Sequence, residues 1–539
     1  MEVSSKFDYI IIGAGSAGCV LANRLTETGR YKVLLMEAGG EDKNPWIHIP
    51  IGYAKHFTNA KINWLYETAP GSEWVKRSIG QPRGKVLGGT SSINGMVYIR
   101  GQAEDYNHWR QLGNEGWSYE DVLPYFIKSE DQQRGSDDFH GVGGPLTVSD
   151  PAEPHPLADA YLEAAVQAGY QLNPDFNGAQ QEGFGYTQWT TDNGRRRSTA
   201  VGYLKPARKR GNLVVITDAH ATRLLFDGLR ANGVEYKKGN KLLQAKAEGE
   251  VIISGGAYNS PQLLQLSGIG PSQLLQRFGV EVVKNLPGVG ENLQDHVNGP
   301  VVYKVNKPFT ANDVANSFSR RIAAGVKYIL SRKGELAWGA SYAGGFIKAD
   351  VDSASPDIQA QIMPYSTESA GGAGGFIASD FSGCTIVTAL LRPESRGYLR
   401  IVSPDPFSAP EIQPNYLAER KDRDVLVAGV QAVRKIMSQN AMRQFIVGEH
   451  KPGKDCLSYD EVLEYILENC RTSFHPVGTC KMGDDENAVV DERLRVHGIE
   501  GLRVIDASIM PTLISGNTNA PAIMIGEKGS DMVLEDAIG

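Results

Sequence analysis

The segment that most constrains the fold is residues 13–18, Gly-Ala-Gly-Ser-Ala-Gly, which has the spacing G-x-G-x-x-G. It follows a continuous apolar run, residues 9–12, with the character of a buried parallel strand. Apolar residues then recur at helical spacing through residue 25, and a second apolar run, residues 32–36, ends at Glu37. The sequence therefore predicts the strand–helix–strand unit in which this glycine pattern binds a dinucleotide.

Each glycine of the motif has its own physical role. Gly13 permits the tight turn, Gly15 lets the backbone approach a pyrophosphate, and Gly18 lets helix and strand pack closely. The N-terminus of the helix offers unpaired N–H groups and the positive end of a dipole to the phosphates. Glu37 is placed to accept hydrogen bonds from ribose hydroxyls. FAD and NAD both use this unit, and its place at the start of a long chain favours FAD.

Composition narrows the class of protein. The chain has 539 residues, a formal net charge of −7 and 41% hydrophobic residues, which excludes a disordered chain, a coiled coil and a nucleic-acid-binding footprint. The five cysteines include no C-x-x-C pair, so we expect neither a disulfide framework nor a metal site. The first residues lack the pattern of a secretory signal, so we expect none, and no apolar stretch approaches the ~18 residues of a membrane span. We expect a cytoplasmic protein, with peripheral membrane association left open.

Four further segments carry a family resemblance. Residues 84–98 read GKVLGGTSSINGMVY, and residues 256–271 read GAYNSPQLLQLSGIGP. Residues 473–483 read SFHPVGTCKMG, and residues 504–526 read VIDASIMPTLISGNTNAPAIMIG. Together with the N-terminal unit, they resemble the GMC (glucose–methanol–choline) oxidoreductase family from about residue 7 to 535. Within that family the chain is most similar to bacterial FAD-dependent alcohol, choline and sorbose dehydrogenases.

The resemblance implies an α/β protein, α+β overall, with two domains. A Rossmann-like FAD-binding domain would be built from the discontinuous segments 1–150, 200–300 and 461–539. A substrate-binding domain, with an antiparallel sheet and covering helices, would come from residues 151–199 and 301–460.

The residues themselves agree with this outline in several places. Residues 398–402 and 412–416 suit short strands and turns, and residues 421–447 show a helical apolar pattern. Pro521 suits the first position of a final helix, with Asn519 just before it.

The resemblance also assigns a cofactor site. Residues 84–98 would run along the flavin ring and ribityl chain, and Asp506 would approach the pyrophosphate. Without the family, an ordinary Gly/Ser-rich loop is the favoured interpretation of residues 84–98. The expected cofactor-binding set is Gly13, Gly15, Ser16, Ala17, Gly18, Glu37, Ala38, Val86, Gly88, Gly89, Asn94, Gly95, Met96, Val97, Ala221, Asp506, Ala507, Asn519, Ala520 and Pro521.

The mode of FAD attachment depends on one position of this loop. Many relatives carry a histidine there that bonds covalently to the flavin. In this chain the corresponding residue, between Ser92 and Asn94, is Ile93. The resemblance therefore implies non-covalent FAD.

The expected catalytic pair is His475 and Asn519. Alcohol oxidation by a flavin moves a hydride to flavin N5 and a hydroxyl proton to a base, and imidazole titrates in the suitable range. Taken alone, a histidine beside a proline is more often structural, but the string SFHPVGTCKMG matches the family's active-site segment. The amide of Asn519 would donate to the substrate oxygen. His497 is interpreted as a structural or surface residue, and Cys480 as a buried structural thiol.

Two other groups of residues have alternative interpretations. The arginine run 195–197 is expected to be a solvated face, because aromatic interleaving and net positive charge are missing. Trp189, Trp338, Tyr342 and Phe474 are candidate pocket walls, and core packing is an equally good interpretation for all but Phe474.

The leading functional hypothesis is an FAD-dependent alcohol dehydrogenase or oxidase that acts on CH–OH groups. A nicotinamide-dependent dehydrogenase and a non-catalytic flavin-binding protein are the alternatives. The partners are a small-molecule alcohol and an electron acceptor, which is O₂, a quinone or a redox protein. The sequence leaves open the alcohol, the acceptor and the oligomeric state.

Overall fold

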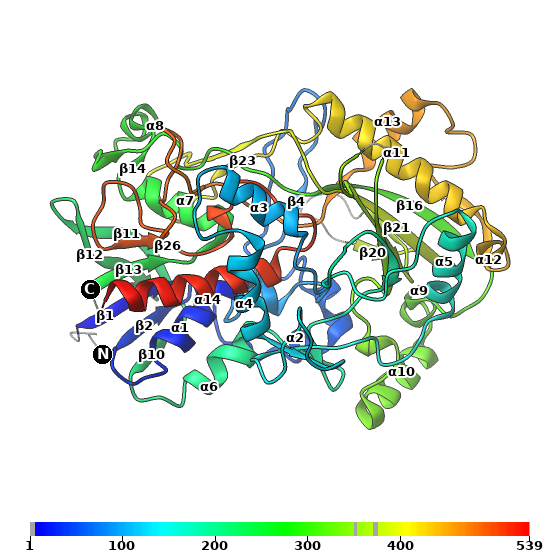
Figure 1. Ribbon diagram of the computed structural model, residues 1–539, viewed down its shortest axis with the longest axis horizontal. Helices are drawn as coiled ribbons and strands as arrows, with labels where there is room; N and C mark the ends of the chain where they lie inside the picture. The colour runs from blue at the N-terminus through cyan, green and yellow to red at the C-terminus, as the bar shows by residue number, and fades with distance from the viewer. Residues whose placement is uncertain (1–5, 350–352, 370–375, 538–539) are drawn as a thin grey trace.

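A computed structural model describes residues 6–349, 353–369 and 376–537. Two seven-stranded sheets, each with its own hydrophobic core, form the two halves of the molecule (Figure 1). Within the described ranges, no helix combines the length and hydropathy that crossing a bilayer requires. All five cysteines have free thiols.

The first sheet is assembled from three distant parts of the chain, in the order β10-β2-β1-β13-β12-β11, with β26 paired to β13. The strands around β1 are parallel, and β1 is a nearly continuous buried apolar run, as expected for a strand covered on both faces. The strands of the first sheet are β1 (Phe7–Ile12), β2 (Val33–Met36), β10 (Leu213–Ile216), β11 (Ala219–Asp227), β12 (Arg230–Lys238), β13 (Lys241–Ile253) and β26 (Leu502–Val504).

Two helices from opposite ends of the chain pack together beside this sheet (Figure 1). They are α1 (Ser16–Leu25) and α14 (Asn519–Asp536). Gly526 allows the close approach, because a Cβ there would lie 3.0 Å from both Ala17 Cα and Val20 Cβ. The N-terminal strand–helix–strand prediction is confirmed.

The second sheet has the order β24-β16-β21-β18-β17-β7, with β25 paired to β16, and its pairings are antiparallel. Helices α5 (Pro156–Gln167), α11 (Arg420–Met437) and α13 (Tyr459–Asn469) pack on it. Its strands are β7 (Gly183–Tyr186), β16 (Val297–Val305), β17 (Ala343–Ile347), β18 (Ile358–Met363), β21 (Gly383–Leu390), β24 (Ile446–Lys451) and β25 (Arg471–Thr472).

The remaining helices and strands complete the two halves and their connections. The further helices are α2 (Pro45–His48), α3 (Ala103–Gln111), α4 (Tyr119–Ser129), α5 (Pro156–Gln167), α6 (Lys205–Ala207), α7 (Gly256–Leu266), α8 (Ser272–Arg277), α9 (Ala311–Ala315), α10 (Phe318–Ser331), α11 (Arg420–Met437), α12 (Asn440–Arg443) and α13 (Tyr459–Asn469). The short strands are β3 (Tyr66–Glu67), β4 (Gly80–Gln81), β5 (Glu130–Gln132), β6 (Leu146–Val148), β8 (Thr191–Asp192), β9 (Arg195–Arg196), β14 (Ile269–Gly270), β15 (Lys284–Asn285), β19 (Thr367–Ser369), β20 (Phe376–Ala378), β22 (Tyr398–Arg400) and β23 (Glu411–Gln413).

Two helix boundaries differ from the sequence predictions. The helical pattern over 421–447 is divided: α11 ends at Met437, and the short α12 follows. The last helix begins at Asn519, so Pro521 is its third residue and not its first. A proline is tolerated there because the N–H groups of a helix's first turn have no partner within the helix.

Strand pairing and helix packing place two of the domain boundaries differently from the sequence prediction. The expected boundary at residue 300 falls inside β16. Helix α13 packs on α11 and β16, and β25 pairs with β16, so both belong to the second sheet. We therefore propose that the C-terminal FAD-binding segment begins after residue 472, not at residue 461.

Candidate active site

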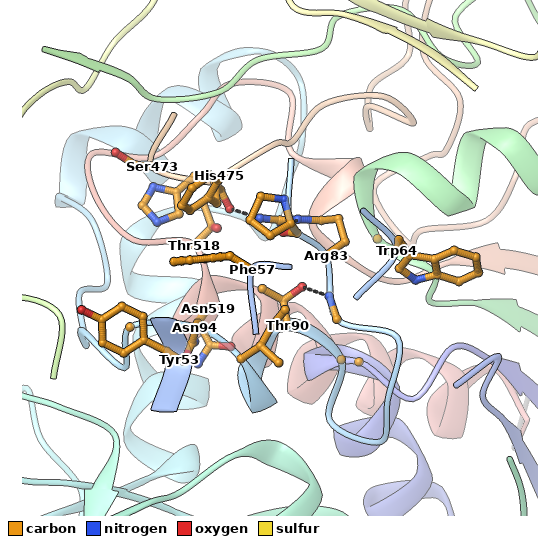
Figure 2. A pocket seen from close by; sticks show the side chains of 18 of the residues that line it. Tyr53, Phe57, Trp64, Arg83, Thr90, Asn94, Ser473, His475, Thr518 and Asn519 are labelled. Carbon is orange, nitrogen blue, oxygen red and sulfur yellow. Dashed lines mark hydrogen bonds between the residues drawn. The ribbon is translucent and has the colours of Figure 1, made fainter. Parts of the chain in front are cut away.

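A cavity of about 940 Å³ lies between the two sheets. On one side it is lined by the loops at the carboxyl ends of β1 and β2, where nucleotides bind in folds of this kind. On the other side, alternate residues of the second sheet face it, such as Asn298 and Pro300 of β16 and Gln361 and Met363 of β18. In Figure 2, His475 and Ser473 lie in the upper part of the cavity and Asn94 in the lower part.

The glycine loop has the geometry that its sequence predicts. Gly13 has φ +104°, and a Cβ there would lie 2.3 Å from the carbonyl oxygen of Ser254. A Cβ at Gly18 would lie 1.9 Å from the carbonyl oxygen of Gly13, so Gly18 allows helix and strand to touch. Gly15 instead borders the open cavity, and its nearest neighbour is the Ser254 oxygen, 4.0 Å from an added Cβ. A bulky anionic ligand therefore has access to the start of α1 at Gly15.

Glu37 stands at the end of β2 and lines the same cavity. Its carboxylate accepts hydrogen bonds from the backbone N–H groups of Ala14 (3.0 Å) and Gly39 (2.8 Å). Burial raises the pKa of this carboxyl to about 7, and the backbone N–H groups oppose that rise. Besides facing the cavity, Glu37 therefore ties the glycine loop to the end of the second strand.

The loop at residues 84–98 packs directly on the glycine loop. The N–H of Gly88 donates to the carbonyl of Ala14 at 2.8 Å, and a Cβ at Gly89 would lie 2.7 Å from Gly15 Cα. Gly88 has φ +87°, a conformation that favours glycine. The two segments therefore form one continuous wall of the cavity.

Arg196 holds this loop in place. Its guanidinium donates to Asn94 Oδ1 (2.6 Å), to the carbonyls of Asn94 (2.7 Å) and Ser91 (3.1 Å), and to that of Ile47 (2.8 Å). The side chain is buried, and burial lowers its pKa to about 9. The expectation that residues 195–197 form a solvated face is therefore wrong for Arg196, although Arg195 is exposed.

The expected cofactor-binding residues fall into two groups. Five of them do not line the cavity: Gly18, Val86, Gly88, Ala520 and Pro521 lie behind those that do. The others line it: Gly13, Gly15, Ser16, Ala17, Glu37, Ala38, Gly89, Asn94, Gly95, Met96, Val97, Ala221, Asp506, Ala507 and Asn519.

The structure changes one member of the expected catalytic pair. The amide nitrogen of Asn517 lies 3.1 Å from His475 Nε2. The side chain of Asn519 instead accepts a hydrogen bond from Ser16 Oγ at 2.8 Å, across the contact between α14 and α1. The pairing expected from the sequence therefore moves from Asn519 to Asn517, because the last helix begins at Asn519 and turns that side chain toward the glycine loop.

A buried relay of hydrogen bonds fixes the tautomer of His475. His296 Nε2 lies 3.1 Å from the carbonyl oxygen of Leu391, which only accepts, so this nitrogen carries the proton. Neutral His296 therefore has a lone pair on Nδ1, 2.9 Å from His475 Nδ1. His475 must donate there, which leaves its Nε2 with the lone pair that faces Asn517.

The orientation of Asn517 agrees with this assignment. Its Oδ1 accepts from Gln359 Nε2 at 3.4 Å, which turns the amide nitrogen toward His475 Nε2. Both the amide NH₂ and the imidazole lone pair thus meet at one point of the cavity wall. A hydroxyl placed there would find a donor and an acceptor side by side.

Electrostatics keep this imidazole neutral. Burial lowers the pKa of His475 well below its ordinary value, and the nearby His296 and Arg83 lower it further. Burial lowers the pKa of His296 to about 4, with partial compensation from the carbonyls of Leu391 and Ile514. Near neutral pH, His475 is therefore in the form that accepts a proton.

A buried carboxylate and an arginine anchor the backbone of His475. Asp295 Oδ1 accepts the N–H of His475 at 2.8 Å, and its Oδ2 accepts from Tyr416 Oη at 2.5 Å and from Thr472 Oγ1. Arg83 donates to the carbonyl of Phe474 at 2.6 Å (Figure 2). His475 is therefore fixed both by hydrogen bonds to its ring and by hydrogen bonds to the backbone at residues 474 and 475.

Comparison with known proteins identifies the family. The chain matches the GMC oxidoreductase family over residues 7–298 and again over residues 393–526. The chain belongs to the GMC oxidoreductases. It is 43% identical to an alcohol dehydrogenase (acceptor) of Pseudomonas putida over 98% of this chain and 96% of that protein. It is 42% identical to an oxygen-dependent choline dehydrogenase of Vibrio vulnificus (strain YJ016) over 99% of this chain and 95% of that protein.

Solved structures of the family have the same fold. A pyridoxine 4-oxidase from Mesorbium loti is 31% identical and superimposes with a TM-score of 0.87, covering 97% of this chain and 98% of that one. A formate oxidase is 26% identical, with a TM-score of 0.91 and 99% of both chains covered. The predicted fold class, an α/β cofactor sheet of discontinuous strands with an antiparallel substrate sheet, is confirmed.

Membership of the GMC family implies FAD, and the cavity fits that group. The open space at Gly15, the start of α1 and the carboxylate of Glu37 suit a pyrophosphate and its ribose. Residues 94–97 and His475 line the same cavity, so a flavin ring between them would contact both. One cavity therefore has room and partners for the whole dinucleotide.

Sequence reasoning missed the parts played in this GMC site by Arg83, Arg196, Asp295, His296 and Asn517. Asp295 and His296 lie in the string Asn-Leu-Gln-Asp-His at 292–296, and an acid next to a histidine is the signal that the sequence offers for them. Among the candidate pocket walls, Phe474 lines the cavity, whereas Trp189, Trp338 and Tyr342 pack on one another in the core.

Proposed function

We propose that the protein oxidises a neutral alcohol to an aldehyde or ketone, with FAD as the immediate acceptor and His475 as the base. The observation that carries the proposal is the lone pair of His475 Nε2 beside the amide of Asn517, inside the cavity that the glycine loop borders. Relatives named as an alcohol dehydrogenase and as choline dehydrogenases support the class of reaction.

The chain's own residues would bind the alcohol and move one proton. Asn517 Nδ2 donates to the substrate oxygen and fixes it, while His475 Nε2 accepts the hydroxyl proton. His475 Nδ1 keeps its hydrogen bond to His296, so the imidazolium that forms stays oriented. Bound FAD would supply the acceptor for the hydride that leaves the carbon.

The lining of the substrate side favours an uncharged alcohol over a quaternary ammonium. The charged side chains on this side of the cavity are mostly cations, namely Lys55, Arg83, Arg321 and Arg471, against one acid, Glu335. A trimethylammonium group would meet net repulsion there, although aromatic side chains could offer a cation–π contact. The aromatic members of this wall, Tyr53, Phe57, Tyr365 and Phe474, suit an apolar substituent on the carbinol carbon.

The FAD is proposed to be bound without a covalent link. Position 93, where relatives attach the flavin through histidine, is the buried aliphatic side chain of Ile93, which lines the cavity. Acid precipitation of the holoprotein should release all of the yellow chromophore into the supernatant. Flavin absorbance that stays with the denatured chain would contradict this part of the proposal.

One experiment tests the function and separates it from its alternatives. The purified holoprotein is mixed anaerobically with a panel of neutral alcohols, choline among them, while flavin absorbance is followed. Bleaching by neutral alcohols is expected, and subsequent addition of air, a quinone or a redox protein reports the acceptor. A protein without a flavin spectrum would be the nicotinamide-dependent alternative, and a flavin that no alcohol bleaches would indicate a non-catalytic flavin-binding protein.

A further inference from the structure

Helix α10 exposes an apolar face that nothing in the described chain covers. Its large apolar side chains Phe318, Ile322, Val326, Ile329 and Leu330 are between 51% and 80% exposed, and only Ala324 and Tyr328 are buried. At 3.6 residues per turn, the five exposed side chains fall within an arc of about 120°. The apolar face of a surface helix usually packs against the protein core. An apolar face that points to solvent instead indicates a site where another molecule or a membrane binds.

The charges of the same segment are all positive. Residues 318–333 contain Arg320, Arg321, Lys327, Arg332 and Lys333 and no acidic residue, in a chain whose formal net charge is −7. On a helical projection, Arg321 borders one edge of the apolar arc, and Lys327 and Arg320 border the other. Lys327 is paired with Glu153 at 3.0 Å, so Arg320, Arg321, Arg332 and Lys333 supply the positive charge of this surface. This is the pattern of a helix that lies in the plane of an anionic lipid surface.

The position of α10 connects this face to the cavity. Figure 1 shows α10 at the periphery of the molecule, next to α9. Four residues that line the cavity are also exposed, and they mark its opening: Ala54, Lys55, Ala315 and Arg321. Two of them belong to α9 and α10, so the opening and the apolar face lie on the same part of the surface.

We propose that α10 is a membrane-docking helix, whose apolar arc enters the interface of a bilayer that contains anionic phospholipid. The five apolar side chains reach the acyl boundary, and Arg320, Arg321, Arg332 and Lys333 meet lipid phosphates. Docking in this orientation turns the opening of the cavity toward the membrane. That last consequence rests on the proposed function, because it gives an apolar alcohol a path from the bilayer to His475.

A second copy of this chain is a less suitable occupant of the face. A two-fold contact between α10 helices would bring like charges together, because Arg320 and Arg321 flank the apolar arc on its two sides. No acid of the helix is available to compensate them. An anionic lipid surface satisfies both the apolar and the cationic groups at once.

The test is cosedimentation of the holoprotein with vesicles of phosphatidylcholine, with and without phosphatidylglycerol. We expect binding to the anionic vesicles that weakens with added salt. The double variant Ile329→Asp/Leu330→Asp should lower the partition coefficient at least about tenfold. The charge variant Arg320→Gln/Lys333→Gln should lower it by about fivefold for each charge removed.

A matched control places the same two charges on exposed apolar residues elsewhere. Leu242 and Leu457 are 61% and 69% exposed and lie outside α10, so Leu242→Asp/Leu457→Asp should bind vesicles as the wild type does. Flavin content and thermal stability of each variant report folding. Absence of vesicle binding, or binding that the α10 variants leave unchanged, overturns the proposal. So does a concentration-dependent dimer that Ile329→Asp/Leu330→Asp abolishes without any vesicle binding. Because partition needs no turnover, this result is independent of whether alcohols reduce the flavin.

Discussion

The Nδ1 atoms of His296 and His475 lie 2.9 Å apart, and only one of them carries a proton. The carbonyl of Leu391, 3.1 Å from His296 Nε2, decides which one, because it requires a proton on His296 Nε2. His475 is therefore the donor of the pair, and its Nε2 is the free base. His296 thus fixes the protonation site of His475, the residue proposed to accept the hydroxyl proton.

Removal of the His296 acceptor should impair catalysis without removing FAD. In His296→Leu, His475 Nδ1–H loses its partner, and the rate of flavin reduction should fall about ten- to a hundredfold, as is typical for the loss of a positioning partner. In His296→Gln, an amide oxygen could accept the same hydrogen bond and partly restore the rate. Stopped-flow reduction at several pH values distinguishes positioning from misfolding.

The two asparagines of the 517–519 segment should behave differently. Asn517→Ala removes the amide beside His475 Nε2, and flavin reduction should slow by about 10²–10³-fold. Asn519→Ala removes the contact with Ser16 and should chiefly weaken FAD retention, with a reduction rate close to that of the wild type. Single-turnover rates and bound-flavin content of both variants make the comparison. A larger rate loss in Asn519→Ala would restore the pairing that the sequence suggested.

The sequence predicted the structure well where the residues that form a feature are close together in the chain. The glycine loop, its strands and Glu37 could be located because turn, helix start and strand end all fall within 40 residues. The sequence predicted Asn519 beside His475, whereas Asn517 lies there. The difference depends on the first residue of the last helix, and such boundaries are the least certain part of a sequence prediction.

Non-local contacts account for the other misses. His296 meets His475 across 179 positions of the chain, and no periodicity reports such a pair. Arg196 stands between two arginines that resemble a solvated run, yet its partners are oxygens of residues 47, 91 and 94. The burial of Arg196 becomes visible only when the loop at residues 84–98 is packed around its guanidinium.

Arg196 should be essential for the stability of that loop. In Arg196→Met, the oxygens of Asn94 and the carbonyls of Ser91 and Ile47 lose their donor, and the free energy of unfolding should fall by about 3 kcal/mol. Loss of bound FAD on gel filtration should accompany a lower Tm. The exposed neighbour gives the control, since Arg195→Met should leave both quantities unchanged. Equal effects of the two substitutions would contradict the role of Arg196.

Stability should decrease as the pH falls below about 6.5. Burial lowers the pKa values of His56, His155 and His296 to about 4, so the unfolded chain binds more protons than the folded one between pH 6.5 and 4. Each pKa unit is about 1.4 kcal/mol for each group. His140, whose pKa is raised to about 9 by Asp175 and Glu130 despite burial, contributes fully throughout this range.

Thermal unfolding of the wild type and His56→Leu between pH 7 and 4.5 checks the acid sensitivity. The Tm of the wild type should fall with pH, and that of the variant should fall less, because one buried neutral imidazole no longer has to be protonated on unfolding. Parallel curves for the two proteins would show that His56 does not carry this effect.

The most direct test of the account is anaerobic single-turnover reduction of the bound flavin by an alcohol in His475→Ala. If His475 Nε2 takes the hydroxyl proton, the rate should fall by about 10²–10⁴-fold while FAD content stays at the wild-type level. A rate close to that of the wild type in this variant would contradict the central claim.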